Sequence, residues 1–569
     1  MSRTAIADAP DPAAAEKGGG GMVSVSHHGA RAGHRWAALV VVCVAALIIN
    51  VDNTILNVAL PTLVRDLHAT SSQLQWIVDS YAMVFAGLLL VGGSLADRFG
   101  RRRFFLLGLA LFATGSIGAA FSGSVHLLIA CRAVMGVGAA VTIPASLSII
   151  NDIFREAKER ARAIGIWAGT IGLGIAVGPI AGGVLLSRFW WGSIFLVNVP
   201  IVAAGFIGAL VLVPDSKNPA AKRPDPTGAV LSIAGLGLLL WAIIEAPSHG
   251  WTSGIVVGVG ATSVVILASF VAWEARSHHP MLPLAYFRER RFSVALAAEC
   301  LGVFGLMGAL FVQTQFLQFY LGYSPLQAGV RILPIAATIV VSATLSPSIA
   351  RLVGVKVTVG AALLAVAGGL WQISLHSTSA TTYADVVLGL LLIGTGAGLL
   401  LPTATNAVVG SVPQGDSGIG SATNTVALQV GGALGVAVVG SVLSTRYQDH
   451  MRAALAGRHV PASVLPSILG SLGGALVVAG RVGGASGGLL AGAARGAFMS
   501  GNKVALALGA AVALGGAAVV LAALPWRTSV DSPDPGTDSP DPGTDTPAVR
   551  GEAPMDTGRP PTVPAPRPS

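Results

Sequence analysis

The chain has 569 residues, of which 53% are hydrophobic and 11% are charged, and its mean hydropathy is +0.72. Soluble domains carry roughly 25% charged residues, so this composition excludes a soluble globular protein and indicates an integral membrane protein. The formal net charge of +9 follows from basic residues in alternate loops, which points to membrane topology and not to a nucleic-acid partner.

Apolar runs near the roughly 20 residues that a membrane-crossing helix needs recur along the chain. They predict an all-α integral membrane protein with fourteen transmembrane helices. The expected spans are residues 37–59, 74–96, 104–122, 126–150, 162–186, 193–213, 228–247, 254–274, 292–313, 328–350, 355–375, 384–409, 419–443 and 502–524.

Arginine and lysine accumulate in cytoplasmic loops close to helix ends. The loops after the second, fourth, sixth, eighth and tenth expected spans are basic, as in the run Arg101 to Arg103. The short loops on the other side contain little more than Arg65 and Arg188. Both termini are therefore expected in the cytoplasm of a multi-pass membrane protein.

Residues 1–35 are polar and lack a cleavage site after a short apolar core, so they predict a disordered cytoplasmic segment before an uncleaved first span. The last segment, residues 526–569, repeats Asp-Ser-Pro-Asp-Pro-Gly-Thr at positions 531 and 538. Such a Pro-rich acidic composition cannot bury a core, and a disordered cytoplasmic tail is expected.

The first expected span contains Asp52 at mid-helix. A charged Asp there costs roughly 2.5 to 3.5 kcal/mol on insertion scales, and such residues usually face a cavity or mark an ion path. Asp52 is the leading proton-coupling candidate, and a hydrogen bond that only fixes packing is the alternative. In the fourth span, Arg132 can control the protonation of a nearby carboxylate. Its alternative is to snorkel from the end of that span.

The loop between the second and third spans combines glycines with an aspartate and arginines. Gly100 suits an unusual backbone angle in a short turn, and Asp97 can pair with arginine or with a helix N-terminus in a clasp that closes the cytoplasmic side. A basic loop that serves topology alone is the alternative. The predicted gating loop comprises Gly93, Asp97, Arg98, Gly100, Arg101 and Arg102.

The fifth expected span has glycines every four residues on one face, which permits close helix contact, and a proline that can bend the helix. Generic packing by small residues is the alternative interpretation. The residues of this pattern are Gly174, Gly178, Pro179, Gly182 and Gly183.

The ninth expected span supplies a second carboxylate, Glu299, as a further proton-coupling candidate. The same span mixes aromatic side chains with uncharged amides, which suits a broad apolar pocket with a few polar groups. Lipid-facing aromatic residues explain that mixture equally well. The predicted substrate pocket comprises Trp76, Tyr81, Phe311, Gln315 and Phe316.

Two internal sequence repeats predict a duplicated architecture. The string Gly136 to Pro144 matches Gly394 to Pro402 at an offset of 258 residues, and Ser94 to Gly100 matches Ser348 to Gly354 at an offset of 254. The seventh and eighth spans have no counterpart and appear as an insertion. The expected organisation is an N-terminal six-helix bundle at 36–214, inserted helices at 215–275, and a C-terminal six-helix bundle at 276–525 with a long external loop at 445–500.

Enzymatic functions and cofactors are not indicated. No Gly-x-x-x-x-Gly-Lys-Ser/Thr phosphate loop occurs, so nothing predicts an ATP-driven pump. The string Gly484 to Gly488 matches Gly-x-Ser-x-Gly, but no strand precedes it. The cysteines Cys43, Cys131 and Cys300 have neither disulfide nor metal-ligand spacing.

The gating loop, the string Asn57 to Pro61, the run Arg132 to Pro144, the glycines of the fifth span and the string Ile194 to Pro200 together resemble the major facilitator superfamily. The resemblance is greatest to its fourteen-helix drug:H+ antiporter branch, the QacA- and EmrB-like exporters. It covers about residues 36–525 and implies gating by the Asp-Arg loop, proton coupling by the arginine of the fourth span, and antiport through the fifth.

The resemblance implies proton-driven efflux of lipophilic drugs, antibiotics or related metabolites across a bacterial cytoplasmic membrane by a monomer, with no cofactor. Few acidic residues occur in the later spans, a departure that bears on recognition of strongly cationic drugs. Two alternatives stay open: a proton-coupled nutrient symporter, and a transport-inactive membrane sensor or anchor that uses the acidic tail.

Overall fold

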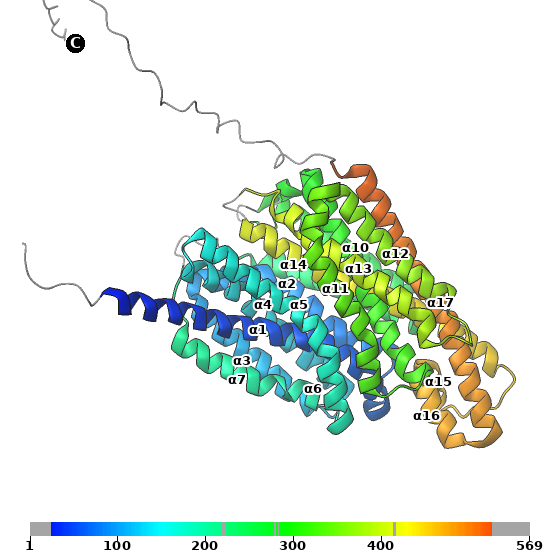
Figure 1. Ribbon diagram of the computed structural model, residues 1–569. Helices are drawn as coiled ribbons and strands as arrows, with labels where there is room; N and C mark the ends of the chain where they lie inside the picture. Colours follow the sequence, from blue (N-terminus) through cyan, green and yellow to red (C-terminus); the bar gives the residue numbers. More distant parts are fainter. Residues whose placement is uncertain (1–23, 218–223, 278–279, 283, 414–416, 526–569) are drawn as a thin grey trace, which may run out of the picture. The chain divides into compact units, whose positions relative to one another are not determined.

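A computed structural model of the chain describes residues 24–217, 224–277, 280–282, 284–413 and 417–525. In this part of the chain, regular secondary structure is entirely helical (Figure 1). The α-helices are α1 (Ser24–Leu67), α2 (Ser71–Phe99), α3 (Arg101–Ala120), α4 (Val125–Ile153), α5 (Ala157–Arg188), α6 (Ser193–Leu196), α7 (Asn198–Leu212), α8 (Pro226–His249), α9 (Gly254–Arg276), α10 (Arg290–Gln315), α11 (Pro325–Val353), α12 (Val355–Leu375), α13 (Tyr383–Val409), α14 (Ser417–Leu455), α15 (Leu465–Gly470), α16 (Leu472–Val482) and α17 (Gly484–Ala523).

Thirteen helical segments of the described residues are long and apolar enough to cross a membrane. The 32-residue helix α5 occupies the position of the remaining expected span, so the all-α membrane fold is confirmed and the count of fourteen is consistent with it. The expected span at 193–213 is divided at Val197 into α6 and α7.

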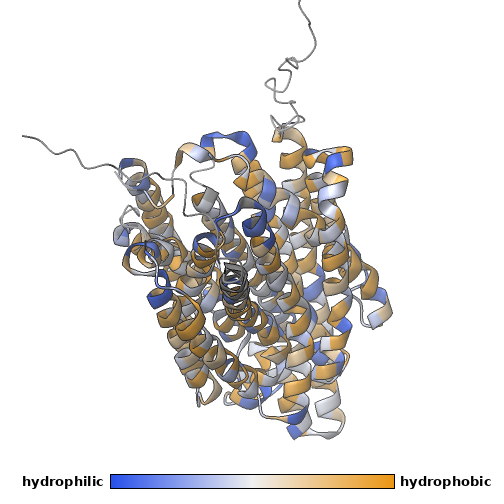
Figure 2. Cartoon of the chain, turned by 60° about the vertical axis from the view of Figure 1, so that its left-hand side comes forward, coloured by the Kyte–Doolittle hydropathy of each residue, from blue (hydrophilic) through white to orange (hydrophobic). Residues whose placement is uncertain are grey.

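Large apolar side chains cover the outward faces of the helices, as lipid contact requires. On α9, Val257, Val264 and Val265 are 56%, 62% and 64% exposed. Figure 2 shows hydrophobic residues along the lengths of the helices and hydrophilic residues gathered towards their ends. Such a surface would be an aggregation hazard in water but is the natural surface of a chain embedded in a bilayer.

The helices form two six-helix bundles with matching internal contacts. In the first bundle α1 packs on α5 and α7, and α4 packs on α2 and α3. In the second bundle α10 packs on α14 and α17, and α13 packs on α11 and α12. Each of these helix–helix contacts in the first bundle therefore has its counterpart in the second, as expected from the internal sequence repeats.

The inserted helices lie at one side of this pair of bundles. Helix α8 packs against α2 of the first bundle and α14 of the second, whereas α9 packs mainly on α8. Trp76 of α2 donates a hydrogen bond from Nε1 to Glu245 of α8 at 3.2 Å, and Trp251, after α8, donates to Thr445 of α14 at 3.0 Å. The insertion thus bridges the two bundles.

The segment expected to be a long loop at 445–500 is instead largely helical. Helix α14 continues to Leu455, α15 and α16 follow, and α17 begins at Gly484. Alanine-rich sequence has a high helix propensity, and glycines with positive φ at 457 and 483 end two of these helices. The Tyr447 hydroxyl of α14 donates to the carbonyls of Ile468 and Ser471, at 2.8 and 3.1 Å, and thereby holds this segment.

The chain ends also differ in part from expectation. Residues 24–35, expected to be disordered, belong to α1. Residues 1–23 and the tail at 526–569 lie outside the described residues.

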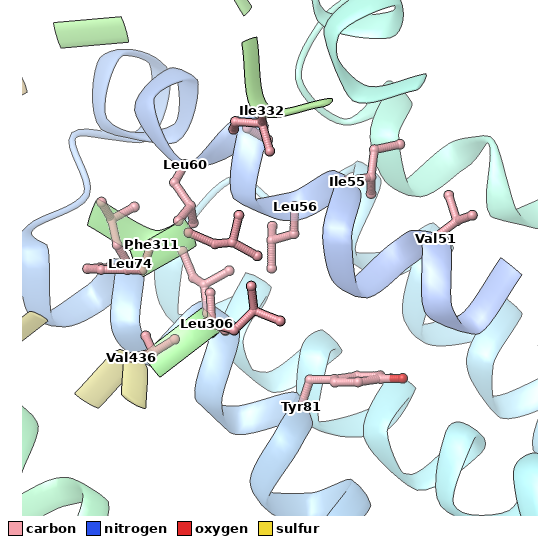
Figure 3. Close-up of a cluster of buried hydrophobic side chains, with 14 of the residues drawn as sticks. Val51, Ile55, Leu56, Leu60, Leu74, Tyr81, Leu306, Phe311, Ile332 and Val436 are labelled. Atoms are coloured by element: carbon pink, nitrogen blue, oxygen red, sulfur yellow. The ribbon is translucent and has the colours of Figure 1, made fainter. Parts of the chain in front are cut away.

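The two ends of the bundles differ in how closely the bundles approach each other. We call the end that carries the α2–α3 and α11–α12 turns, with Arg101 to Arg103 and Lys356, the basic end, and the end that carries the α1–α2 turn and α15–α16 the far end. Between the basic end and the far end, Val51, Leu56 and Leu60 of α1 lie in one apolar cluster with Leu306 of α10, as Figure 3 shows. Ile332 of α11 and Val436 of α14 belong to the same cluster.

The contacts along one face of α5 differ between the two ends of the bundles. Gly165, Gly169, Pro179 and Gly183 lie on one stripe of the helix, by their spacing. At the far end, a Cβ at Gly183 would lie 2.7 Å from the Leu326 Cα of α11. Towards the basic end, Cβ atoms at Gly165 and Gly169 would meet nothing within 4 Å among the described residues. The bundles are therefore closed together at the far end and apart along this stripe at the basic end.

Candidate functional site

An ion pair is buried inside the first bundle. Arg132 of α4 contacts the Asp52 carboxylate of α1 with 2.5 Å between Nη1 and Oδ2, and both side chains are 0% exposed. Helix α4 brings the guanidinium there because its apolar face packs between α2 and α3. The structure thus joins two residues that the sequence proposed separately, and Arg132 does not snorkel to the end of its span.

Neutral groups complete the surroundings of the pair. Asn198, at the start of α7, donates to the other Asp52 oxygen at 2.8 Å and to Ser116 at 3.0 Å. Arg132 Nε donates to the Ile77 carbonyl at 3.1 Å, and the guanidinium lies 4.4 Å from the centre of the Tyr81 ring. The pair is thus held by α1, α2, α4 and α7 together.

Asn198 was not among the residues selected from the sequence as a coupling candidate. It lies in the string Ile194 to Pro200, and the signal available was a polar amide in the middle of an expected apolar span. The structure supplies the reason for an amide at this position, because Asn198 begins α7 directly after the break from α6 and so faces the α1 carboxylate.

Breaking a buried ion pair by removing one charge is unfavourable, because the remaining charge loses its partner in a medium of low dielectric constant. The Asp52 carboxylate is thus balanced by the Arg132 guanidinium and hydrogen-bonded by the Asn198 amide in the interior of the first bundle.

Helix α1 connects the ion pair with the second bundle. Thr54, half a turn after Asp52, donates to the Gly174 carbonyl of α5 at 3.0 Å. The Val58 carbonyl, nearly two turns after Asp52, accepts a hydrogen bond from Gln318 of the second bundle at 2.8 Å. Within two turns of Asp52, helix α1 therefore contacts both α5 and the second bundle.

The five residues selected on α5 divide into two groups. Gly174, Gly178 and Gly182 pack on α1 around Asn50 and Ile55, inside the first bundle. Pro179 and Gly183 face α11 instead, where Pro179 lies against Gly329 and Gly183 against Leu326. One face of the helix thus assembles the first bundle, and the other forms the closed seam between bundles.

The predicted gating loop contacts other helix ends of the first bundle and, from the Arg101 backbone N–H, the Ser216 carbonyl that follows it in the chain. Arg101 Nε lies 2.8 Å from Asp97, and its Nη1 lies 3.4 Å from Asp152 at the end of α4. Arg102 donates to the Val213 carbonyl at the end of α7, at 3.3 Å. Gly100 has φ of 126°, a value that glycine adopts readily and that confirms the reason for a glycine there. In this conformation the loop holds α2, α3, α4 and α7 together and does not bridge the bundles.

The remaining two members of this loop play smaller parts. A Cβ at Gly93 would lie 3.3 Å from the Pro144 ring of α4, so a glycine permits close α2–α4 packing there. The Arg98 guanidinium lies 5.7 Å from the centre of the Phe99 ring.

Arg101→Ala is expected to slow transport, whereas Arg103→Ala serves as its matched control. Arg101 is 15% exposed and contacts two carboxylates, but Arg103 is 75% exposed with one at 3.6 Å. Exposed pairs contribute roughly 0 to 1 kcal/mol. Initial rates at equal amounts of inserted protein measure the difference, and equal rates for the two variants would show that the contacts of Arg101 are unimportant.

Glu299 of α10 lies apart from the Asp52 pair, in the second bundle. It is fully buried, and its Oε1 accepts a hydrogen bond from Thr405 of α13 at 2.5 Å. Asn424 of α14 donates to the same Thr405 hydroxyl at 3.1 Å. The structure therefore does not place Glu299 beside Asp52 and Arg132, but gives it polar partners of its own.

Residues 42–436 match the model of the Major Facilitator Superfamily. The chain belongs to the major facilitator superfamily. Relatives named for drug efflux, resistance and export place it among the drug exporters of that superfamily, so it is a transporter and not an enzyme.

Several relatives are named for drug efflux or resistance. The multidrug efflux pump LfrA of Mycolicibacterium smegmatis is 36% identical over 489 residues, which are 85% of this chain and 95% of that protein. The multidrug resistance protein Stp of Mycobacterium tuberculosis is 37% identical over 73% of this chain and 79% of its own length. The tetracenomycin C resistance and export protein of Streptomyces glaucescens is 33% identical over 86% and 91%.

Solved structures support the fold. A bacterial homologue of the human lysosomal transporter Spinster, in an inward-facing and occupied conformation, matches with a TM-score of 0.60 at 16% identity, over 86% of this chain and 97% of that one. A peptide transporter bound to sulfate matches with a TM-score of 0.58 at 15% identity. These likenesses establish the major facilitator fold alone.

Of the five residues selected for a substrate pocket, Tyr81, Phe311 and Phe316 belong to one buried apolar cluster in this conformation. Trp76 faces α8, and Tyr81 lies against Arg132. Phe311 and Phe316 are each 1% exposed within the apolar cluster, and Gln315 donates to the Phe311 carbonyl at 3.2 Å. A pocket formed by all five stays a prediction for another conformation of the transporter.

Asp79 of α2 is a further buried carboxyl. It is 0% exposed, and neither side-chain oxygen has a hydrogen-bond partner in the described part of the chain. It lies on α2 one turn from Gln75, which contacts Ser441 of α14 at 3.4 Å, and one turn from Ala82, which packs with α8 and α14. Asp79 therefore lies along the seam between the bundles and the inserted helices.

Proposed function

We propose that this protein exports lipophilic drugs, antibiotics or related metabolites across the bacterial cytoplasmic membrane in exchange for protons. The observation that carries the proposal is the fully buried Asp52–Arg132 pair at 2.5 Å on a helix that also contacts the second bundle. The names of the relatives, which refer to efflux, export and resistance, favour export over nutrient uptake.

In this proposal the basic end faces the cytoplasm, because basic loops stay on that side, and both termini lie there too. The structure then corresponds to a state closed to the outside, with the seam of α5 and α11 in contact. When the far end opens, Asp52 takes a proton, which weakens its pair with Arg132. When the basic end opens, the proton leaves and the pair forms again.

The energy for export comes from the proton gradient. One pH unit is worth about 1.4 kcal/mol, or a tenfold ratio of concentrations, and each charge that moves down the membrane potential contributes about 2.3 kcal/mol per 100 mV. Substrate release outward and proton release inward can be coupled only if the two ligands favour opposite arrangements of the bundles.

Dye export by everted membrane vesicles tests the coupling. Asp52→Asn is expected to weaken export driven by a pH gradient, because an amide cannot take up and release a proton. Asp66→Asn is the matched control, since Asp66 lies on the same helix but is exposed at its end. Nigericin, which collapses the pH gradient, should stop export by the parent protein. Undiminished export by Asp52→Asn would refute the assignment.

We further propose that the exporter functions as a monomer, and that its substrate lies between the two bundles. Trp76, Tyr81, Phe311, Gln315 and Phe316 are proposed as contributors to that pocket when the bundles rearrange. The inserted helices 215–275 and the bundles at 36–214 and 276–525 are the proposed functional units.

A further inference from the structure

The cluster around Glu299 has a chain of hydrogen bonds with a defined direction. Asn424 donates from Nδ2 to Thr405 at 3.1 Å, and Thr405 donates its only proton to Glu299 Oε1 at 2.5 Å. Three helices of the second bundle, α10, α13 and α14, contribute one side chain each. The direction of the chain identifies the carboxyl as its final acceptor.

Two oxygens of the cluster are left without a donor. Glu299 Oε2 and Asn424 Oδ1 are both buried and have no hydrogen-bond partner in the described part of the chain. Glu299 is 0% exposed and Asn424 is 4% exposed. A buried acceptor without a donor is unfavourable by roughly 1 to 3 kcal/mol. The cluster is therefore complete only when a donor or a cation is added to it.

No basic side chain of the described residues forms an ion pair with Glu299, whose chain of hydrogen bonds comes from Thr405 of α13 and Asn424 of α14. Both of these side chains are neutral. On α10 the charged side chains are Arg290 and Arg291, at least eight residues away at the basic end. Among the described side chains, the α-helices packed against α10 carry His34, Arg35, Asp52, Arg65 and Asp66 on α1, Lys356 on α12, Asp385 on α13, Arg446, Asp449, His450 and Arg452 on α14, and Arg495 and Lys503 on α17.

The spacing of residues along α10 places the cluster between the bundles. Glu299, Val303, Leu306 and Leu310 share one stripe of the helix. Leu306 lies in the apolar cluster with α1 (Figure 3), and Glu299 lies about 10 Å nearer the basic end, at 1.5 Å per residue. Thr405 is only half-buried. The carboxyl is therefore on the side of α10 that faces the first bundle, at the end where the bundles part.

We propose that Glu299, Thr405 and Asn424 form a second proton-binding site, so that each bundle contains its own coupling carboxyl. The proton binds to Glu299 Oε2 from a hydronium ion, which becomes water, and returns to water on release. This inference rests on the proposed proton-coupled export, and it adds a consequence that Asp52 alone does not have. A complete cycle moves two protons for each substrate molecule.

The number of protons fixes the concentration ratio that the exporter can reach. With the membrane potential held at zero, a gradient of one pH unit supports about a tenfold ratio of a neutral substrate for one proton and about a hundredfold ratio for two. The experiment uses the purified full chain in liposomes of bacterial phospholipid with valinomycin and equal potassium on both sides. A neutral lipophilic dye is the probe.

The parent protein is expected to reach about a hundredfold ratio, and Glu299→Gln about tenfold. Dye-for-dye exchange without a gradient should persist in Glu299→Gln, because an amide occupies the same space and imitates the protonated carboxyl. Glu299→Asp should restore the parent ratio, since it restores an acid. Glu274→Gln is the matched control, because Glu274 is a buried carboxyl, 2% exposed, on the peripheral helix α9.

Each other outcome overturns the second site in a recognisable way. A hundredfold ratio in Glu299→Gln shows that Glu299 carries no proton while export by Asp52 stands. Loss of exchange in both Glu299→Gln and Glu299→Asp shows a structural role. If a sodium gradient changes the ratio reached by the parent but not by Glu299→Gln, Glu299 binds sodium and not a proton. If Glu299→Gln lowers the export of cationic dyes only, Glu299 belongs to substrate binding. If the parent does not respond to pH at all, the proposed function itself fails.

Discussion

Arg132→Met is expected to destabilise the folded transporter by about 3 to 5 kcal/mol, because it leaves the buried Asp52 carboxylate without its cation. Asn198 remains as a donor at 2.8 Å, but an amide does not neutralise a charge. Thermal unfolding of the protein in detergent, followed by the loss of the monodisperse peak, measures the effect. The unfolding temperature should be lower than that of the parent.

The double variant Asp52→Asn/Arg132→Met separates stability from coupling. Replacing both members of a buried ion pair by neutral groups of similar size is often neutral for stability, so the double variant should recover most of the lost unfolding temperature. It should nevertheless export dye to a lower concentration ratio than the parent, since no proton-binding carboxyl remains at this site. Parent-like uphill export by the stable double variant would show that the pair is only structural.

Gly183→Ala is expected to open the far end of the transporter. The added Cβ would lie 2.7 Å from the Leu326 Cα and 3.1 Å from the Pro325 carbonyl oxygen, both backbone atoms at the start of α11. Because backbone cannot move aside as a flexible side chain can, the helices must separate. Overpacking of this kind costs roughly 1 to 3 kcal/mol, which corresponds to a shift of about 5- to 150-fold towards the outward-open state.

Spin labels across the seam measure this shift. In a background with Cys43, Cys131 and Cys300 replaced, exposed Ser187 on α5 and exposed Gln327 on α11 provide the labelling positions. Gly169→Ala is the matched control on the same stripe of α5, since its Cβ would meet nothing within 4 Å. The distance between labels should lengthen in Gly183→Ala alone. An unchanged distance would mean that α5 and α11 do not form the seam that closes the far end.

The membrane class, the duplication and the family were predictable because they depend on local or repeated sequence. Whether a segment is long and apolar enough to cross a membrane depends on its own residues and not on the helices around it. Composition and periodicity were therefore sufficient to place the spans. The unfavourable energy of a charge in a membrane was also enough to select Asp52 and Arg132, although neither their contact nor their burial followed from it.

The prediction of a long loop at 445–500 was wrong for a definable reason. Its glycines and scattered arginines argued against a membrane span, but alanine favours a helix whether or not that helix crosses the bilayer. The stop positions at Gly457 and Gly483 became clear only from their positive φ. The contact of Tyr447 with α15 and with the start of α16 could not be predicted from any sequence pattern within the segment.

By itself, the sequence determined that this chain is a duplicated, many-helix membrane protein with a charged pair worth attention, since hydropathy and repeats are properties of neighbouring residues. Tertiary structure alone decided that Asp52 meets Arg132 across 80 residues and Asn198 across 146. It also decided that Glu299 pairs with Thr405 instead, and that Gly183 faces α11 while Gly182 faces α1. Contacts between distant helices depend on how whole surfaces pack together, and no single segment contains that information.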